Sequence, residues 1–177
     1  MKFRIIFYFI ALSIISLSCN HDKVSVLEGC CGNPALDEAI GNGHIYLPNI
    51  FTPNGDNIND LMTVYGDSIL LIINMQIKNS DGRKVFETSN IIPGISQSSW
   101  DGYVDGVVKK GLYTVSLEIE AEDGTIGNFE SKVCNFPCGD TDMTEKISGT
   151  GCQFPAQNDD GHYNSNLNSY EQSDCYE

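Results

Sequence analysis

The sequence predicts an all-β fold in which two sheets pack face to face. Long segments alternate between apolar and polar residues with the period of two that turns one face of a strand toward a core. Turn clusters rich in glycine, asparagine and aspartate separate these segments. About seven short strands in about 90 residues, with almost no helical periodicity, are typical of an immunoglobulin-like β-sandwich. We expect this sandwich over residues 44–138, with a flexible N-terminal tether and an acidic C-terminal tail.

The first segment has the pattern of an export signal. Lys2 and Arg4 precede an apolar run over residues 5–15. A charged start followed by an apolar core of this length is typical of a signal peptide, and the run is too short to span a bilayer as a helix. Residues 1–18 are therefore predicted to be a signal peptide, and the protein is predicted to be exported.

The signal segment ends in a short motif that suggests a lipid anchor. Residues 16–19 read SLSC, which resembles the lipobox of bacterial lipoproteins, where a peptidase cleaves before the cysteine and its thiol carries diacylglycerol. We expect lipidation at Cys19, a tether over residues 19–43, and a place in the outer membrane on either its periplasmic or its outer face. Ordinary cleavage near Ser18, with Cys19 in a disulfide, is the alternative.

The predicted sandwich contains two strands with especially clear alternation. In residues 112–121 every second side chain from Tyr113 to Ala121 is apolar, with polar or charged side chains between them. In residues 69–78 one face is wholly apolar and the other becomes polar toward Lys78. Both indicate half-buried strands of an antiparallel sheet. The predicted strands, in chain order, are residues 45–51, 61–65, 69–78, 84–88, 107–108, 112–121 and 126–136.

Charge excludes one class of partner. Ten Lys and Arg residues stand against 24 Asp and Glu residues, which gives a formal net charge of −14. Nucleic-acid binding requires a basic face, so no nucleic-acid partner is expected. An anionic membrane surface would repel the folded part, so the membrane is expected as a partner only through the lipid anchor. Residues 139–177 are acidic and poor in apolar residues, and we expect this tail to be disordered or held by disulfides.

Cysteine parity is consistent with a lipidated Cys19. Without it six of the seven cysteines remain, an even number that fits three disulfides in an exported protein. Six cysteines permit 15 pairings, and the adjacent pair is not expected to bond to itself. Zinc held by thiolates is the rival, although the chain has no CxxC pair. The disulfide candidates are Cys30, Cys31, Cys134, Cys138, Cys152 and Cys175.

A group of motifs carries a family resemblance. Residues 48–60 read PNIFTPNGDNIND, and MQIKNSDGRKVFET at residues 75–88, WDG at 100–102 and KGLY at 110–113 follow in order. This series closely resembles the gliding-motility-associated C-terminal domain of Bacteroidetes, the type B sorting domain of type IX secretion. The resemblance implies an immunoglobulin-like sandwich, a cell-envelope or secreted setting, and a module read by the secretion machinery. Trp100, the single tryptophan, is expected to fill one end of the core.

The loop in the first of these motifs has two interpretations. Asn54, Asp56, the Ile58 carbonyl and Asp60 fall at every second position, the spacing by which calcium loops present oxygens to one ion. If calcium binds, Asp101 is a further candidate ligand, because domains of the resembled family pair the two motifs. Alternatively, Asn and Asp form Asx-turns that fix the bend without an ion.

No motif indicates catalysis. GxSxG, HExxH, Walker and Rossmann patterns are missing from the sequence, and its three histidines lie in or beside polar segments rather than in a cluster. We expect a noncatalytic cell-envelope lipoprotein that acts in surface assembly or binding, with envelope or secretion-machinery proteins as partners. The alternatives are a secreted protein whose domain is a type IX sorting signal, and a glycan-binding surface protein.

Overall fold

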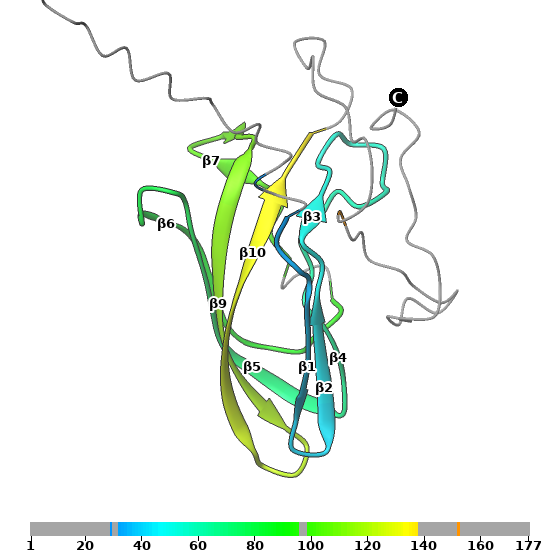
Figure 1. Cartoon of the computed structure of the whole chain (residues 1–177). Coiled ribbons are helices and arrows are strands. Elements are labelled where there is room, and N and C mark those ends of the chain that lie inside the picture. The colour runs from blue at the N-terminus through cyan, green and yellow to red at the C-terminus, as the bar shows by residue number, and fades with distance from the viewer. Residues whose placement is uncertain (1–28, 30–31, 96–98, 138–151, 153–177) are drawn as a thin grey trace, which may run out of the picture.

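The computed structural model describes residues 29, 32–95, 99–137 and 152 (Figure 1). Within them the chain forms β-strands joined by turns. In order, these are β1 (Leu36–Ile40), β2 (Gly43–Leu47), β3 (Ile50–Phe51), β4 (Tyr65–Asp67), β5 (Ile69–Lys78), β6 (Lys84–Ile91), β7 (Tyr103–Val104), β8 (Val107–Val108), β9 (Gly111–Ala121) and β10 (Ile126–Asn135).

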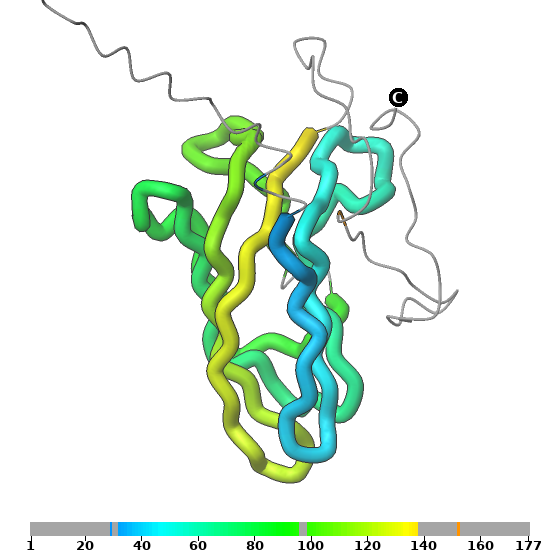
Figure 2. Tube along the Cα trace, in the orientation of Figure 1, coloured from blue at the N-terminus to red at the C-terminus, as the bar shows by residue number. Residues whose placement is uncertain are grey.

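The strands confirm the predicted all-β sandwich. One sheet has the order β1-β2-β4 and the other the order β3-β10-β9-β5-β6, while β7 and β8 form a separate two-stranded ribbon. In the Cα trace of Figure 2 the chain crosses from one sheet to the other. The sheets are antiparallel except at one edge, where β3 lies parallel to β10.

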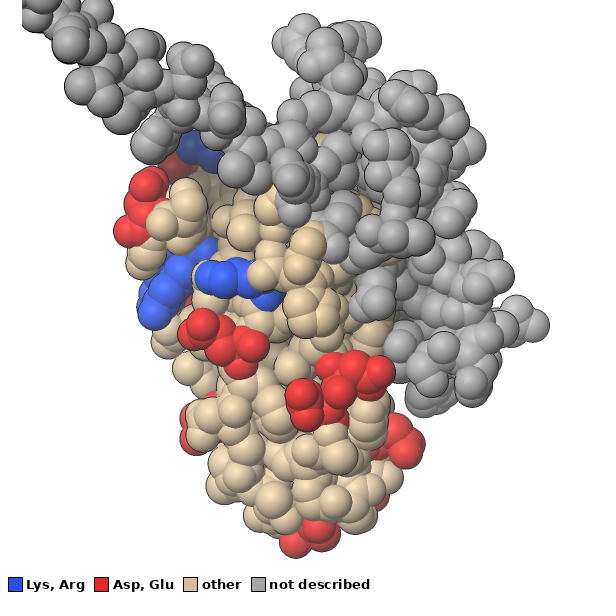
Figure 3. Space-filling view, in the orientation of Figure 1, with Lys and Arg blue, Asp and Glu red and all other residues tan. Residues whose placement is uncertain are grey.

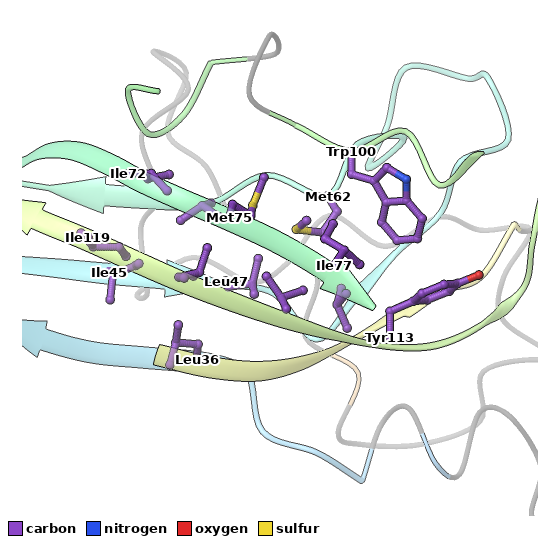
Figure 4. Close-up of a cluster of buried hydrophobic side chains, with 14 of the residues drawn as sticks. Leu36, Ile45, Leu47, Met62, Ile72, Met75, Ile77, Trp100, Tyr113 and Ile119 are labelled. Carbon is purple, nitrogen blue, oxygen red and sulfur yellow. The ribbon is translucent and has the colours of Figure 1, made fainter. Parts of the chain in front are cut away.

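The core lies between the two sheets and follows from the alternation in the sequence. In β9 every second residue from Tyr113 to Ala121 is buried, and the residues between them are partly exposed. Ile72, Met75 and Ile77 of β5 face the same interior, opposite Ile45 of β2 and its neighbours (Figure 4). Burying each large apolar side chain stabilises the fold by about 1.5–3 kcal/mol, so this layer is the main source of stability.

The N-terminal boundary of the sandwich is a correction to the prediction. Part of the segment assigned to the tether, residues 19–43, is strand β1, which pairs with β2 from Leu36 opposite Leu47 to Ile40 opposite Gly43. Only Leu36 and Ile40 of this strand are buried, and the three residues between them are exposed. That spacing of four does not show the alternation by which strands are recognised. The sandwich therefore begins before His44.

Two predicted strands differ in their bounds. The segment 45–51 is divided into β2 and β3, because Pro48 lacks the N–H that a continuous ladder needs. The chain crosses there from the three-stranded to the five-stranded sheet. The segment 61–65 is mostly not a strand: Met62 forms an isolated bridge with Trp100, and β4 begins only at Tyr65.

Candidate functional site

Three of the sequence motifs meet at one end of the sandwich, which we call the motif end. It comprises residues 51–62, 100–102, 109–113 and 135. Met62 and Trp100 exchange two backbone hydrogen bonds of 2.8 and 3.0 Å, which join the end of the first motif to the WDG motif. The Trp100 ring lies 5.4 Å from the Phe51 ring and 4.7 Å from the Tyr113 ring, measured between centroids. Figure 4 shows Trp100, Met62 and Tyr113 together at one end of the core.

Trp100 fills the position that the sequence predicts. Its side chain is 1% exposed, and its indole Nε1–H donates to the Tyr103 carbonyl at 3.3 Å. Its near-perpendicular contact with Tyr113 is the edge-to-face geometry that aromatic pairs favour. Tyr113 in turn donates its hydroxyl to the Lys109 carbonyl at 2.7 Å, and burial raises the pKa of Tyr113. These bonds fix the WDG and KGLY motifs to each other.

The loop over residues 54–60, which we call the motif loop, is organised by the Asp60 carboxylate. Its Oδ1 accepts hydrogen bonds from the backbone N–H groups of Asn54 and Gly55 at 2.9 and 2.8 Å. Its Oδ2 accepts a third, from Asn57 N–H, at 2.8 Å. Gly55 and Asn57 have φ angles of 85° and 67°, left-handed values that glycine and asparagine adopt most readily. Asp60 therefore ties three backbone N–H groups of the loop to one carboxylate, and the Asn54 N–H also donates to the Thr52 carbonyl at 2.8 Å.

The other candidate calcium ligands also take part in turn contacts. Asp56 Oδ1 accepts from Ile58 N–H at 2.8 Å, and the Ile58 carbonyl accepts from the Thr52 hydroxyl at 3.4 Å. Asp101 Oδ1 accepts from Tyr103 N–H at 3.1 Å. Within the described part of the chain, no group of three or more His, Cys, Asp or Glu residues has an arrangement that could hold a metal ion. These contacts favour the Asx-turn interpretation, and calcium binding stays a prediction.

A buried contact that the sequence did not predict closes the motif end. Asn135, at the end of β10, is fully buried and donates from Nδ2 to the Gly102 carbonyl at 2.8 Å. Gly102 has a φ of +79°, and a Cβ there would lie 2.5 Å from Asn135 Nδ2 and 3.0 Å from Pro53 Cγ. Asn135 Oδ1 is buried without a hydrogen-bond partner. Only the glycine of the WDG motif signals this close approach in the sequence.

The opposite end of the sandwich has its own clasp, which joins the turn after β1 to the turn after β9. The Asp123 carboxylate accepts from the backbone N–H groups of Asn42 and Thr125, each at 2.9 Å. The hydrogen bonds from Thr125, followed by the one from Asn42, lower the pKa of Asp123. Gly41 lies against the same carboxylate, since a Cβ at Gly41 would be 2.5 Å from both of its oxygens.

Several predicted sites lie wholly or partly outside the described residues. Among the cysteines, Cys134 and Cys152 are disulfide-bonded in the structure, and Cys134 is fully buried in β10. The pairing pattern of the six candidates stays a prediction. The lipidation candidate Cys19, the signal peptide 1–18 and the cysteines at positions 30, 31, 138 and 175 lie outside the described residues, as does the tail 139–177 apart from Cys152. Across the described ranges, no helix has the length and apolar character needed to cross a membrane.

Comparison with known families identifies the central part of the chain. Residues 45–129 match the sequence model of a family described as the CHU_C Type IX secretion signal domain. The match runs from within β2 into β10, and it confirms the family resemblance that the motifs predict. Strand β1 and the last part of β10, including Asn135, lie outside the matched residues. No curated protein and no solved structure matches the chain.

Proposed function

We propose that the sandwich is the part of this protein that the type IX secretion machinery recognises, because residues 45–129 match the family model of a type IX secretion signal domain. The protein is then exported to the cell surface or released, and its partners include components of that machinery. The family match is the single observation that carries this proposal. The fold supports this proposal, because contacts at the motif end hold together three motifs that are distant in sequence. These are the motif loop, the WDG motif and the KGLY motif.

We propose further that the module is noncatalytic. The carboxylates of the motif loop, which would be the first candidates for acid or base chemistry, accept backbone N–H bonds within their own turns. The WDG aspartate does the same with Tyr103. Through these contacts the carboxylates fix the shape of the turns at the motif end, and we propose that these turns form the recognition surface.

We also propose that the exported protein is anchored through a diacylglyceryl group on Cys19. The proposal rests on the signal segment and on the lipobox resemblance of residues 16–19. Replacement of Cys19 by Ser should release the protein from the membrane fraction and should remove the mass of the lipid. A Cys19→Ser protein that stays in the membrane fraction at the same level would contradict the anchor without touching the sorting proposal.

The sorting proposal is tested with a reporter fused in front of residues 20–177, the predicted mature segment without the lipidation candidate Cys19, behind a cleavable signal without a lipobox. We call residues 20–177 the mature chain below. The fusion starts upstream of β1 because that strand belongs to the sandwich. In a host with a working type IX system the reporter should reach the surface or the medium. In an otherwise identical host lacking the type IX translocon it should remain in the periplasm. Periplasmic retention in both hosts would refute a sorting role.

A matched pair of variants localises the signal. Asp60→Ala disturbs the motif loop, whereas Asp81→Ala removes an acid from the exposed turn between β5 and β6, where its carboxylate accepts only a long, 3.5 Å contact from Asn79. If the motif end is the recognised surface, Asp60→Ala should reduce export of the fusion and Asp81→Ala should not. Equal export of both variants, with both folded, would place recognition elsewhere.

A further inference from the structure

The outer face of the five-stranded sheet carries polar side chains in rows that the strand register defines. In the lysine row, Lys78 of β5 lies opposite Lys84 of β6 and opposite Thr114 of β9, and Thr114 lies opposite Lys132 of β10. In the next row, which we call the acid-amide row, Gln76 lies opposite Glu87 and Ser116, and Ser116 lies opposite Glu130.

The lysine row is unusual for this chain. Only ten Lys and Arg residues occur against 24 acids, yet three lysines lie in one row across the sheet. Lys78 directly faces Lys84, and like charges directly opposite each other in a sheet are destabilising. Figure 3 shows Lys and Arg atoms clustered in the left half of that view, with Asp and Glu atoms next to them.

Neighbouring groups engage some of these cations and leave others available. Lys84 Nζ contacts Glu87, and Arg83 in the adjacent turn binds both oxygens of Asp105 at 2.8 Å. Lys132 Nζ donates to the neutral Thr114 hydroxyl, which does not cancel its charge. Among the described residues, neither Lys78 nor Lys132 forms an ion pair with a carboxylate. Their two positive charges therefore face the groove without a paired anion.

The two rows border a hollow in the surface. A groove of about 480 Å³ is lined by Lys78, Lys132 and Thr114 together with Ser80, Ser116 and Glu130. A second hollow of about 380 Å³ shares Ser116 and Glu130 and continues along Asn74, Gln76, Glu118 and Asn128. Volumes of this size are typical of small-ligand sites. The lining combines hydroxyl, amide, carboxylate and ammonium groups with apolar surface, to which Leu112 contributes in the first groove and Leu117 and Phe129 in the second.

We propose that this groove binds a glycan that carries uronic acid residues. The uronate carboxylate lies between Lys78 and Lys132, where charge-assisted hydrogen bonds are strongest. The ring hydroxyls reach the acid-amide row, where Ser116, Gln76 and Glu130 accept or donate hydrogen bonds. A uronate presents one negative charge beside several neutral hydroxyls, and this matches a cationic row next to a row of amides, hydroxyls and carboxylates.

The acid-amide row distinguishes this ligand from other anions. An acidic peptide such as polyglutamate carries a carboxylate on every side chain but no hydroxyl that could donate to Glu130 or Glu118. A uronate carries hydroxyls beside its carboxylate, and these hydroxyls donate hydrogen bonds to the two glutamates while the carboxylate stays at the lysine row. The charged residues of the site lie on a sheet face outside the motif end, although Leu112 of the motif end also lines the groove. Substitutions of those charged residues can therefore separate glycan binding from secretion.

The test uses the mature chain, residues 20–177, and titration calorimetry with three probes: oligogalacturonate, its fully methyl-esterified form and polyglutamate. Oligogalacturonate should bind, with an affinity that falls as salt is added. The ester, which keeps the hydroxyls and lacks the charge, should bind at least about tenfold more weakly. No binding of oligogalacturonate, equal binding of the ester, or tighter binding of polyglutamate would each overturn the proposal.

Matched variants assign the binding to the lysine row. Lys78→Gln combined with Lys132→Gln should weaken oligogalacturonate binding about tenfold or more. Lys109→Gln combined with Lys110→Gln makes the same change in net charge on lysines outside the row and should leave the affinity unchanged. Equal losses in the two double variants would show a general charge effect and refute the site. The reporter fusion carrying Lys78→Gln and Lys132→Gln should still be secreted, which separates failure of this site from failure of the sorting proposal.

Discussion

Asp60 provides the sharpest test at the scale of single residues. Its carboxylate accepts three backbone N–H groups, so Asp60→Ala removes all three bonds at once. We expect a loss of about 1–2 kcal/mol in the free energy of unfolding, similar to loss of a helix cap. Urea unfolding of the mature chain measures it, with Asp81→Ala as the control that should change little. An unchanged urea midpoint in Asp60→Ala would mean that the loop is held by other contacts.

Calcium dependence of the same loop separates its two interpretations. The carboxylates already accept turn hydrogen bonds, so we expect the thermal midpoint to be the same with millimolar-scale calcium and with chelator. A midpoint that rises with calcium in the natural protein, and no longer rises in Asp56→Ala, would instead establish an ion site.

Asp123 makes stability depend on pH. Hydrogen bonds from Thr125 and Asn42 lower its pKa in the folded state below the value in the unfolded chain. The stability that Asp123 contributes is therefore fully present above the unfolded pKa of about 4, and it is lost as pH falls through the folded pKa. Asp123→Asn should lower the thermal midpoint at pH 7, and the difference from the natural protein should shrink in acid. A constant difference from pH 7 to pH 2 would contradict this assignment.

The sequence predicts local contacts of residues better than distant ones. The Asx-turns of the motif loop span two to six residues, and the pattern of Asn, Gly and Asp in that loop is sufficient to predict them. The Asn135 to Gly102 hydrogen bond joins residues 33 positions apart. No local pattern encodes such a pair, because its geometry depends on how two strands and a loop come together. The same is true of the Asp123 clasp on Asn42.

At the scale of elements, the turn at Gly102 couples the WDG motif to β10. Gly102→Ala meets two obstacles: a left-handed φ of +79° and a clash with Asn135 and Pro53. Gly55→Ala is a matched control, since Gly55 has a φ of +85° and nothing within 4 Å of its would-be Cβ. The φ penalty alone is about 1–2 kcal/mol. We expect Gly102→Ala to lose measurably more stability in urea unfolding than Gly55→Ala, and equal losses would show that Asn135 yields without cost.

The sequence predicts strands well where apolar and polar residues alternate over a long segment. The strands over residues 69–78 and 112–121 appear as β5 and β9, within one residue of the predicted bounds, because ten or more alternating residues leave one consistent register. Strand β1 was missed because its two buried residues are four apart, and β4 was misplaced because Met62 pairs with Trp100 rather than with a sheet strand. In both, tertiary contacts override the local pattern.

For the whole molecule, β1 determines where the domain can be cut. A chain that begins at His44, the boundary expected from sequence, lacks Leu36 and Ile40 and leaves β2 paired only with β4. Loss of these two buried side chains should cost about 3–6 kcal/mol. That is a large share of the stability of a small domain. Thermal unfolding and reporter export should both be impaired for residues 44–177 and normal for residues 20–177. Equal stability of the two chains would show that β1 is an accessory strand.

The parallel pairing of β3 with β10 joins a strand that is synthesised early to one that is synthesised late. Ile50 and Phe51 lie at the start of the first sequence motif, and their sheet partners are Cys134 and Asn135, at the far end of the described domain. A chain that leaves the ribosome or crosses the inner membrane N-terminus first must hold β3 unpaired until β10 follows. The sandwich is thus completed last at the edge where its motif begins. A truncated or stalled chain that lacks the end of β10 would leave Ile50 and Phe51 without their sheet partners, so this edge of the sandwich forms only in a chain synthesised at least as far as Asn135.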